Sequence, residues 1–358
     1  MKTFFDARWT RTDHHDGISR FGSSLLEALA ELTPVTMLVH DERQLALLPH
    51  GIPHLLVNHP LSVRELLLPR LLNELGADVV YSPMQVMGTL GRHYKLIFTL
   101  HDTIYYEFPL APTYLPPAQR AVWWLFHQAN WPGRLVLNLA DLVATVSETS
   151  KREIVSRHLT DRPVVVIPNA PPKLGSVTGQ ATVNRELVFM GTLMPYKNTE
   201  TLIRVLPLLP DYHLNLAGRG TADRMDALRG LADQIGVTAR VTFWNGVSDA
   251  TYAGLLATAT AAVSASRAEG FGLPLIEAMS SGTPFIGTDM PIFHEVGGDA
   301  VLFFDPDSPA DLAARVREVE DPALRARLIE LGRRRAATFS WERSAARLYE
   351  VMRELTSS

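Results

Sequence analysis

The sequence predicts an α/β fold made of two Rossmann-like domains, each built on a parallel sheet. Three observations lead to this prediction. The chain has 358 residues, more than one compact domain usually holds. Short β-type runs alternate with amphipathic helical stretches, as they do where crossover helices join parallel strands. The alternation stops once, near residue 170, and then begins again.

The predicted strands are short apolar runs rich in β-branched residues. In the first domain they are Val35–Val39, Val79–Tyr81, Leu96–Leu100, Leu142–Val146 and Val164–Ile167. In the second domain they are Leu187–Met190, His213–Ala217, Val241–Phe243, Ala261–Ser264 and Pro284–Gly287. Several runs end at Gly, Asn, Ser or Asp, which suit strand-to-helix turns. Ligands of such sheets bind at the carboxyl ends of the strands, so these turns are where chemistry is expected.

The domain boundaries follow from the break in the pattern. The segment Asn169–Thr182 is rich in proline and glycine and has weak periodicity, so we expect a linker there. The predicted domains are residues 1–171 and 172–339, followed by a terminal segment 340–358. Within that segment Trp341–Leu355 is amphipathic and predicts a helix.

The composition is that of a globular protein with two cores, since 46% of the residues are hydrophobic and 20% are charged. A net charge of −4 argues against a nucleic-acid partner. The absence of cysteine excludes disulfides, thiolate zinc sites and cysteine nucleophiles. The chain lacks a secretory signal at its start and an apolar run of roughly 18 residues. We therefore expect a cytoplasmic protein, with any membrane contact peripheral and at the inner face.

The strongest motif is the stretch from Glu269 to Met279, which follows an apolar strand and opens a helix. Gly270 and Gly272 leave backbone N–H groups uncovered beside the helix N-terminus, a favourable place for an anion. Glu269 precedes the helix and Glu277 lies about two turns further on, so both could line one wall. A carboxylate repels phosphate, so these two should bind hydroxyl groups. The simpler interpretation is that this stretch is only the start of a helix with an acidic first turn.

The stretch from Glu269 to Glu277 resembles the Glu-x7-Glu element of glycosyltransferase family four, the retaining GT-B enzymes. The resemblance continues in order along most of the chain. It is carried by Gly17–Phe21, Leu100–Asp102, Thr145–Glu148, Ile167–Asn169, Phe189–Asn198, Leu216–Gly220 and Asp289–Asp305.

This resemblance implies two domains that face each other across a cleft, with the final helix crossing back to the first domain. It implies a nucleotide-sugar donor in the second domain and a glycan or lipid-linked acceptor in the first. The turn Phe189–Asn198 is similar to that of bacterial mannosyl- and rhamnosyltransferases, which makes GDP-mannose the expected donor. A UDP-sugar is the alternative. No cofactor and no metal are expected.

The resemblance also implies roles for single residues. Glu269 would contact hydroxyls of the donor sugar, and Glu277 those of the ribose. Lys197 would neutralise the diphosphate as it leaves. The residues expected in catalysis are His101, Lys197 and Glu269, and those expected to bind the nucleotide sugar are Gly17, Arg219, Gly270, Phe271, Gly272, Leu273 and Glu277.

One departure from the family pattern puts the phosphate site in question. Many relatives carry an arginine at the position of Thr192 or of Tyr196. Arg219 or Arg20 could replace it, and the sequence leaves this open. Other functions also stay open: a nucleotide-sugar epimerase, a sugar phosphorylase or a catalytically silent binding subunit. The cluster Asp13–Asp16 is contiguous, which argues against a metal site.

An unusual aromatic cluster comprises Trp123, Trp124, Phe126 and Trp131. We expect these side chains to pack beneath the first sheet, since large apolar groups are usually buried. The alternative is a surface for the acceptor or for a membrane interface, where indole rings lie at headgroup level.

Overall fold

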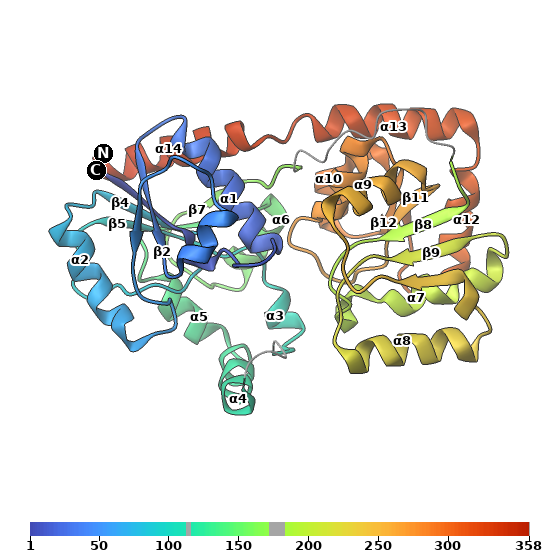
Figure 1. The fold of residues 1–358 in the computed structure, drawn as a ribbon, viewed down its shortest axis with the longest axis horizontal. Helices are drawn as coiled ribbons and strands as arrows, with labels where there is room; N and C mark the ends of the chain where they lie inside the picture. The colour runs from blue at the N-terminus through green and yellow to red at the C-terminus, as the bar shows by residue number, and fades with distance from the viewer. Residues whose placement is uncertain (112–115, 172–182, 358) are drawn as a thin grey trace. The chain divides into compact units, whose positions relative to one another are not determined.

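The computed structural model describes residues 1–111, 116–171 and 183–357, which form two compact units (Figure 1). The first unit comprises Met1–Asn169 together with Ser340–Ser358, and the second comprises Ala170–Phe339. Most of the predicted linker Asn169–Thr182 lies outside the described residues.

A parallel sheet forms the centre of the first unit. Its strands are β1 (Thr3–Asp6), β2 (Val35–Val39), β3 (His54–Leu56), β4 (Val79–Ser82), β5 (Lys95–Thr99), β6 (Leu142–Thr145) and β7 (Val164–Val166). Over the described residues this sheet has seven strands, in the order β3-β2-β1-β4-β5-β6-β7. The chain builds outward from β1 to β3 and then resumes on the other side of β1 with β4. The order therefore reverses between β1 and β4, where such sheets hold ligands.

The first unit also contains helices, most of which connect these strands. They are α1 (Gly17–Ala30), α2 (Leu68–Glu74), α3 (Ile104–Glu107), α4 (Pro117–Phe126), α5 (Asn130–Leu137), α6 (Glu148–Ser156) and α14 (Trp341–Ser357). The last of these confirms the predicted terminal helix, and it packs against α1 in the first unit (Figure 1). Leu348, Val351 and Met352 form its buried stripe at helical spacing. Ser344 Oγ also donates to the Pro168 carbonyl, at 2.7 Å.

The second unit repeats the plan with a parallel sheet of its own. Its strands are β8 (Glu186–Phe189), β9 (His213–Leu216), β10 (Val241–Phe243), β11 (Ala261–Ser264), β12 (Phe285–Thr288) and β13 (Val301–Phe304). Within the described part of the chain the sheet has six strands, in the order β10-β9-β8-β11-β12-β13. The reversal here lies between β8 and β11.

The helices of this unit cover its sheet. They are α7 (Thr199–Arg204), α8 (Ala222–Gln234), α9 (Asp249–Thr258), α10 (Leu273–Ser281), α11 (Pro291–Gly297), α12 (Pro309–Glu318) and α13 (Pro322–Ala336). A strand that is covered on both faces buries every side chain, so its consecutive residues must all be apolar. β8 meets this requirement, since Leu187, Val188 and Phe189 are all buried.

Every predicted strand is present, with some ends shifted by a residue, and the two-sheet fold is confirmed. The prediction missed β1, β3 and β13. β1 and β3 are very short, and each includes a polar residue that weakens the apolar signal. β13 lies inside Asp289–Asp305, which the sequence analysis used only as part of the family resemblance.

Candidate functional site

The turns that follow β8, β9 and β11 share one edge of the second sheet. β8 pairs in parallel with β9 on one side and with β11 on the other, so the three carboxyl ends lie together. Lys197 follows β8, Arg219 follows β9 and Glu269 follows β11. The sheet order reverses between β8 and β11, so Lys197 and Glu269 flank the place where open α/β sheets bind ligands.

Two glycines allow the first two turns to approach each other. Gly191 has a φ of 147°, and a Cβ atom on Gly218 would lie 1.6 Å from the Gly191 carbonyl oxygen. A side chain at position 218 would thus force the turns apart. The Leu193 amide donates to the Arg219 carbonyl at 2.9 Å, which joins the turns after β8 and β9.

Lys197 and Glu269 form an ion pair at this edge. The Lys197 Nζ lies 2.5 Å from Glu269 Oε1, and each side chain is 12% exposed. Lys197 ends a short 3-10 helix, Pro195–Lys197, and the next residue, Asn198, is left-handed with a φ of 50°. The Arg267 amide donates to the Tyr196 carbonyl at 2.8 Å and so ties the β11 turn to this 3-10 helix. The cation and the carboxylate predicted to act on one donor are thus in direct contact.

Ser266 is a site residue that the sequence analysis missed. Its side chain is fully buried, and its hydroxyl donates to Glu269 Oε1 at 2.9 Å. The Ser264 hydroxyl lies 2.9 Å from that of Ser266, and Thr288 Oγ1 donates to the Ser266 carbonyl at 2.6 Å. This buried chain of hydroxyls fixes the orientation of the Glu269 carboxylate. The sequence does contain a signal for Ser266, namely two serines at the end of an apolar strand. A buried hydroxyl at such a place needs a hydrogen-bond partner.

The turn Gly270–Gly272 leads into α10 as predicted. Gly272 has a φ of 85°, and a Cβ atom there would meet the Phe293 ring at 3.0 Å, so glycine suits this position. α10 begins at Leu273 without a side-chain cap. The Phe271 ring is buried and packs edge-on against Phe339 at 5.5 Å. Phe271 can therefore offer a ligand only its backbone.

Glu277 lies on the buried side of α10 and is 8% exposed. Its carboxylate faces Tyr252 of α9. Burial, together with the Glu277 carboxylate, raises the pKa of the Tyr252 phenol well above 10. The phenol stays protonated and donates to Glu277, which holds this carboxylate in place.

Arg219 is exposed at the end of β9, at the same sheet edge. A Cβ atom on Gly246 would lie 2.5 Å from Arg219 Nε, so the arginine side chain runs against the turn after β10. Tyr196, at one position of the absent arginine, is buried, whereas Thr192, at the other, is exposed. Arg20 belongs to α1 in the first unit.

His101 and Gly17 belong to the first unit. His101 follows β5, and its Nε2 donates to the Pro83 carbonyl at 2.9 Å, which leaves Nδ1 as the acceptor of the neutral ring. The ring packs edge-on against Phe21 at 4.9 Å, and burial lowers the pKa of His101. Gly17 is the first residue of α1, which Asp16 caps by accepting from the Ser19 amide at 2.9 Å.

The expected burial of the aromatic cluster is wrong. α4 contains no buried residue, and Trp124 and Trp131 are 47% and 65% exposed. The long connection from β5 to β6 carries α4 away from the sheet (Figure 1). Among the described helices, none is both long and apolar enough to cross a membrane.

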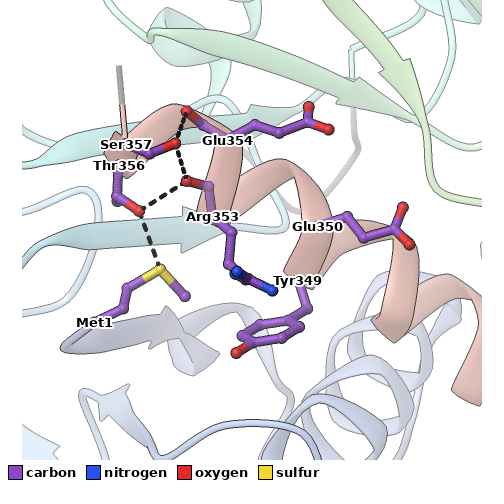
Figure 2. A pocket seen from close by; sticks show the side chains of 7 residues that line it. All are labelled: Met1, Tyr349, Glu350, Arg353, Glu354, Thr356 and Ser357. Atoms are coloured by element: carbon purple, nitrogen blue, oxygen red, sulfur yellow. Dashed lines mark hydrogen bonds between the residues drawn. The ribbon is translucent and has the colours of Figure 1, made fainter.

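A surface pocket lies elsewhere in the first unit, beside the end of α14. Figure 2 shows its lining side chains, which are Met1, Tyr349, Glu350, Arg353, Glu354, Thr356 and Ser357. Thr356 Oγ1 lies 3.5 Å from the Met1 sulfur, so the pocket marks where α14 meets the start of the chain. It contains none of the predicted site residues.

Family models match the chain in two adjacent stretches. Residues 15–170 match Glycosyltransferase Family 4, and residues 176–335 match Glycosyl transferases group 1. The O-antigen chain mannosyltransferase B of Escherichia coli is 32% identical over 58% of this chain and 58% of its own length. The D-inositol 3-phosphate glycosyltransferase of Mycolicibacterium smegmatis is 28% identical over 58% of this chain and 51% of its own. The match spans only about half the length of these curated relatives.

Solved structures share the whole fold. The sucrose-phosphate synthase of Thermosynechococcus elongatus superposes with a TM-score of 0.76, at 18% identity, over 99% of both chains. HepE of Anabaena, solved in complex with UDP and glucose, gives a TM-score of 0.74 at 18% identity, over 98% of this chain and 99% of that one. At this level of identity the likeness concerns the fold.

Proposed function

The chain belongs to glycosyltransferase family 4, and on that premise we propose that it is a retaining hexosyltransferase that moves mannose from GDP-mannose to a glycan or lipid-linked acceptor in cell-envelope polysaccharide synthesis. The observation that carries the proposal is the Lys197–Glu269 pair, at the point where the second sheet reverses its order. It joins a cation for a leaving diphosphate to a carboxylate for sugar hydroxyls. The start of α10, which supplies backbone amides, follows the same turn.

In the proposed reaction the bond between the anomeric carbon and the diphosphate oxygen breaks. The bond to the acceptor hydroxyl oxygen forms on the same face of the sugar, and the hydroxyl proton passes to the departing diphosphate. This route needs no protein nucleophile. Negative charge develops on the diphosphate, where Lys197 and the N-terminal amides of α10 would stabilise it. Because these groups supply the positive charge, we propose that no metal takes part.

The hydrogen bonds of the pair suggest how donor binding would proceed. Lys197 would turn from Glu269 to the diphosphate, exchanging one anion for another. Ser266 would keep the Glu269 carboxylate oriented toward the sugar hydroxyls during this exchange. Glu277, held by Tyr252, would bind the ribose hydroxyls. We propose that His101 of the first unit acts next to the transferred sugar and Gly17 next to the diphosphate. Arg219 would bind the phosphates in place of the absent arginine.

The donor is chosen on two supports. The turn Phe189–Asn198 resembles that of mannosyltransferases, and an O-antigen mannosyltransferase is among the relatives. HepE of Anabaena, which was solved in complex with UDP and glucose, keeps a UDP-sugar as the second candidate. We place the enzyme in the cytoplasm at the inner face of the membrane, where such donors and lipid-linked acceptors meet.

A turnover assay tests the proposal. The purified chain is incubated with GDP-mannose, UDP-glucose, UDP-N-acetylglucosamine or dTDP-rhamnose and a lipid-linked glycan acceptor, and the anomeric configuration of the product is read by NMR. We expect transfer from GDP-mannose with retention. Inversion would overturn the mechanism, and transfer from a UDP-sugar alone would overturn the donor. Conversion of the donor without an acceptor would indicate an epimerase, and binding without turnover a silent subunit.

A further inference from the structure

Arg335, in the last turn of α13, binds the end of another helix, α11. Its Nε donates to the Val296 carbonyl at 3.0 Å, and its Nη2 donates to the Glu295 carbonyl. The last carbonyls of a helix have no partner within the helix, and an arginine side chain can supply one. The Gly298 amide donates to the His294 carbonyl in the same turn. Arg335 and Gly298 together therefore close the end of α11.

The helix that carries Arg335 is itself fixed, because α13 packs along α10 (Figure 1). A Cβ atom on Gly332, which precedes Arg335 by about one turn, would lie 3.2 Å from the Met279 side chain of α10. Gly332 is buried, and glycine at this position lets the two helices approach closely. Arg335 thus extends toward α11 from a helix that also supports α10, the helix that follows the turn Gly270–Gly272.

Phe293 connects α11 to that turn. Phe293 is buried in α11, and its ring lies against two glycines of other elements. A Cβ atom on Gly272 would lie 3.0 Å from this ring, and a Cβ atom on Gly287 of β12 would lie 2.8 Å from it. Protein interiors packed this closely transmit strain. A shift of α11 would therefore move the Phe293 ring and with it the turn Gly270–Gly272.

A second series of contacts leads from Arg335 to the same turn. The Arg335 guanidinium lies over the Phe339 ring, with Cζ 5.2 Å from the ring centroid, a distance at which a cation and an aromatic ring attract each other. The Phe339 ring packs edge-on against Phe271 at 5.5 Å. The two series of contacts thus end at Phe271 and at Gly272, which are adjacent residues of the turn before α10.

We propose that Arg335 is a positioning residue for the diphosphate of the donor. By holding α11 and Phe339, it would fix the direction of the backbone amides from Phe271 to Leu273. Such donors stabilise an anion best when their orientation is set before the charge arrives. The proposal rests on the proposed function, because it assigns a diphosphate to this turn. It adds a residue that touches neither the sugar nor the nucleotide.

Hydrogen exchange of the ligand-free full chain, read residue by residue by NMR, tests the positioning without any nucleotide. Arg335→Met removes the guanidinium and keeps an unbranched side chain. The amides to follow are those of Leu275 and Gly298, which donate to the Gly272 and His294 carbonyls. We expect both amides to exchange about fivefold faster in Arg335→Met, while the amides of the core strand β8, which report global unfolding, keep their rates.

The matched control is Arg325→Met on the same helix. Arg325 also donates to two backbone carbonyls, those of Ala259 and Thr260, but these precede β11 and so lie at the opposite edge of the sheet from the turn. Arg325→Met should leave the exchange of Leu275 and Gly298 unchanged.

Titration calorimetry with GDP, and with guanosine in competition against GDP, then relates the turn to phosphate binding. We expect Arg335→Met to bind GDP about fivefold more weakly than the wild type and guanosine with the same affinity, because guanosine has no phosphate. Phe339→Leu removes only the second series of contacts, so its affinity for GDP should lie between those two proteins. UDP and uridine are titrated in the same way.

The results separate this proposal from the proposed function. Unchanged exchange at Leu275 and Gly298 in Arg335→Met, with a wild type that binds GDP or UDP, would overturn the positioning role alone. Equal losses of affinity for the nucleoside and the diphosphate would overturn it too, since the defect would not concern the phosphates. A wild type that binds neither GDP nor UDP would overturn the proposed function and the diphosphate role of Arg335 together, and faster exchange in Arg335→Met would then support only its hold on the turn.

Discussion

The two sheets place ion pairs at corresponding edges, but they hold them in opposite ways. At the switch point of the first sheet, Asp6 ends β1 and pairs with Arg8, whose Nε lies 2.7 Å from Asp6 Oδ1. Arg8 also binds Glu65, at 2.7 Å, and both Arg8 and Asp6 have fully buried side chains. At the switch point of the second sheet, Lys197 and Glu269 form a single pair that retains access to solvent.

We infer from this difference that the first edge serves the structure and that the second could exchange its charges with a ligand. The Arg8 guanidinium meets two carboxylates, and the Gly88 amide and the Ser82 hydroxyl add further bonds to Glu65 and Asp6. Such a closed network joins the turns of the first sheet and leaves the Arg8 and Asp6 charges already satisfied. Among the described residues Lys197 has one carboxylate partner and keeps some exposure, which would allow an incoming diphosphate to take that partner's place. An ion pair at a sheet edge therefore indicates a site only when its charges can be exchanged.

The largest expected effect is on the free energy of unfolding, and it comes from the buried network of Arg8, Asp6 and Glu65. Arg8→Met should lower the free energy of unfolding by about 3–5 kcal/mol, because it leaves two carboxylates facing each other without a buried cation. Urea unfolding followed by fluorescence measures the loss. Arg70→Met is the control, since Arg70 forms an exposed pair with Glu74 in the same unit and should leave stability nearly unchanged. Equal effects of the two substitutions would remove the distinction between the two edges.

The second effect is on turnover, and it comes from the Lys197–Glu269 pair. Lys197→Ala and Glu269→Gln should each lower turnover at least about tenfold, which corresponds to about 1.4 kcal/mol of lost transition-state stabilisation. Arg185→Ala serves as control, because Arg185 forms an exposed pair with Asp211 in the same unit. Wild-type turnover in both site variants would show that the pair is only structural.

A smaller effect is expected from Ser266. Ser266→Ala removes one hydrogen bond to Glu269, worth about 1 kcal/mol, so kcat should fall by about fivefold. Because Ser266 acts by positioning the carboxylate, Ser266→Thr, which keeps the hydroxyl, should recover most of the rate. Steady-state kinetics separate kcat from KM. If alanine and threonine reduce kcat equally, volume and not the hydroxyl is what matters at this position.

The smallest effect is on the pH dependence of the unfolding free energy, and it comes from His101 in the first unit. Burial lowers the pKa of His101 below its usual 6.5, so the folded chain binds this proton less readily than the unfolded chain. The contribution of His101 to stability is complete above pH 6.5 and decreases as the pH falls toward the folded pKa. His101→Gln should therefore make the unfolding free energy depend less steeply on pH below 6.5, as measured by urea unfolding across that range. An unchanged slope would contradict the burial of this ring.

Sequence patterns predicted the fold where the signal was local. Strands such as β2 and β11 are apolar runs that stand out, and both were found with their bounds. β1 was missed although it lies inside the sheet between β2 and β4, because its four residues carry a polar side chain at each end and give little apolar signal. The aromatic cluster of α4 was misplaced for another reason. An apolar helix face has the same sequence pattern whether it packs on the core or faces the solvent.

The candidate site was predictable where backbone geometry dictates residue type. Gly272 and the start of α10 follow from the need for a left-handed turn before a helix. The buried Ser266 hydroxyl could not be derived in the same way, since its partner Glu269 becomes evident only when the turn is folded. The Arg8 network joins residues far apart in the chain, and charge patterning along a sequence does not reveal such contacts.

Thermal unfolding with nucleotides tests directly whether the Lys197–Glu269 edge is a nucleotide-sugar site. Wild type and Lys197→Ala are heated with GDP, GDP-mannose, UDP or UDP-glucose at a concentration near one hundred times the dissociation constant. Binding at this level stabilises a fold by about 2.7 kcal/mol. We predict that GDP and GDP-mannose raise the melting temperature of the wild type and raise that of Lys197→Ala much less. Equal shifts in both proteins, or no shift with any nucleotide, would contradict it.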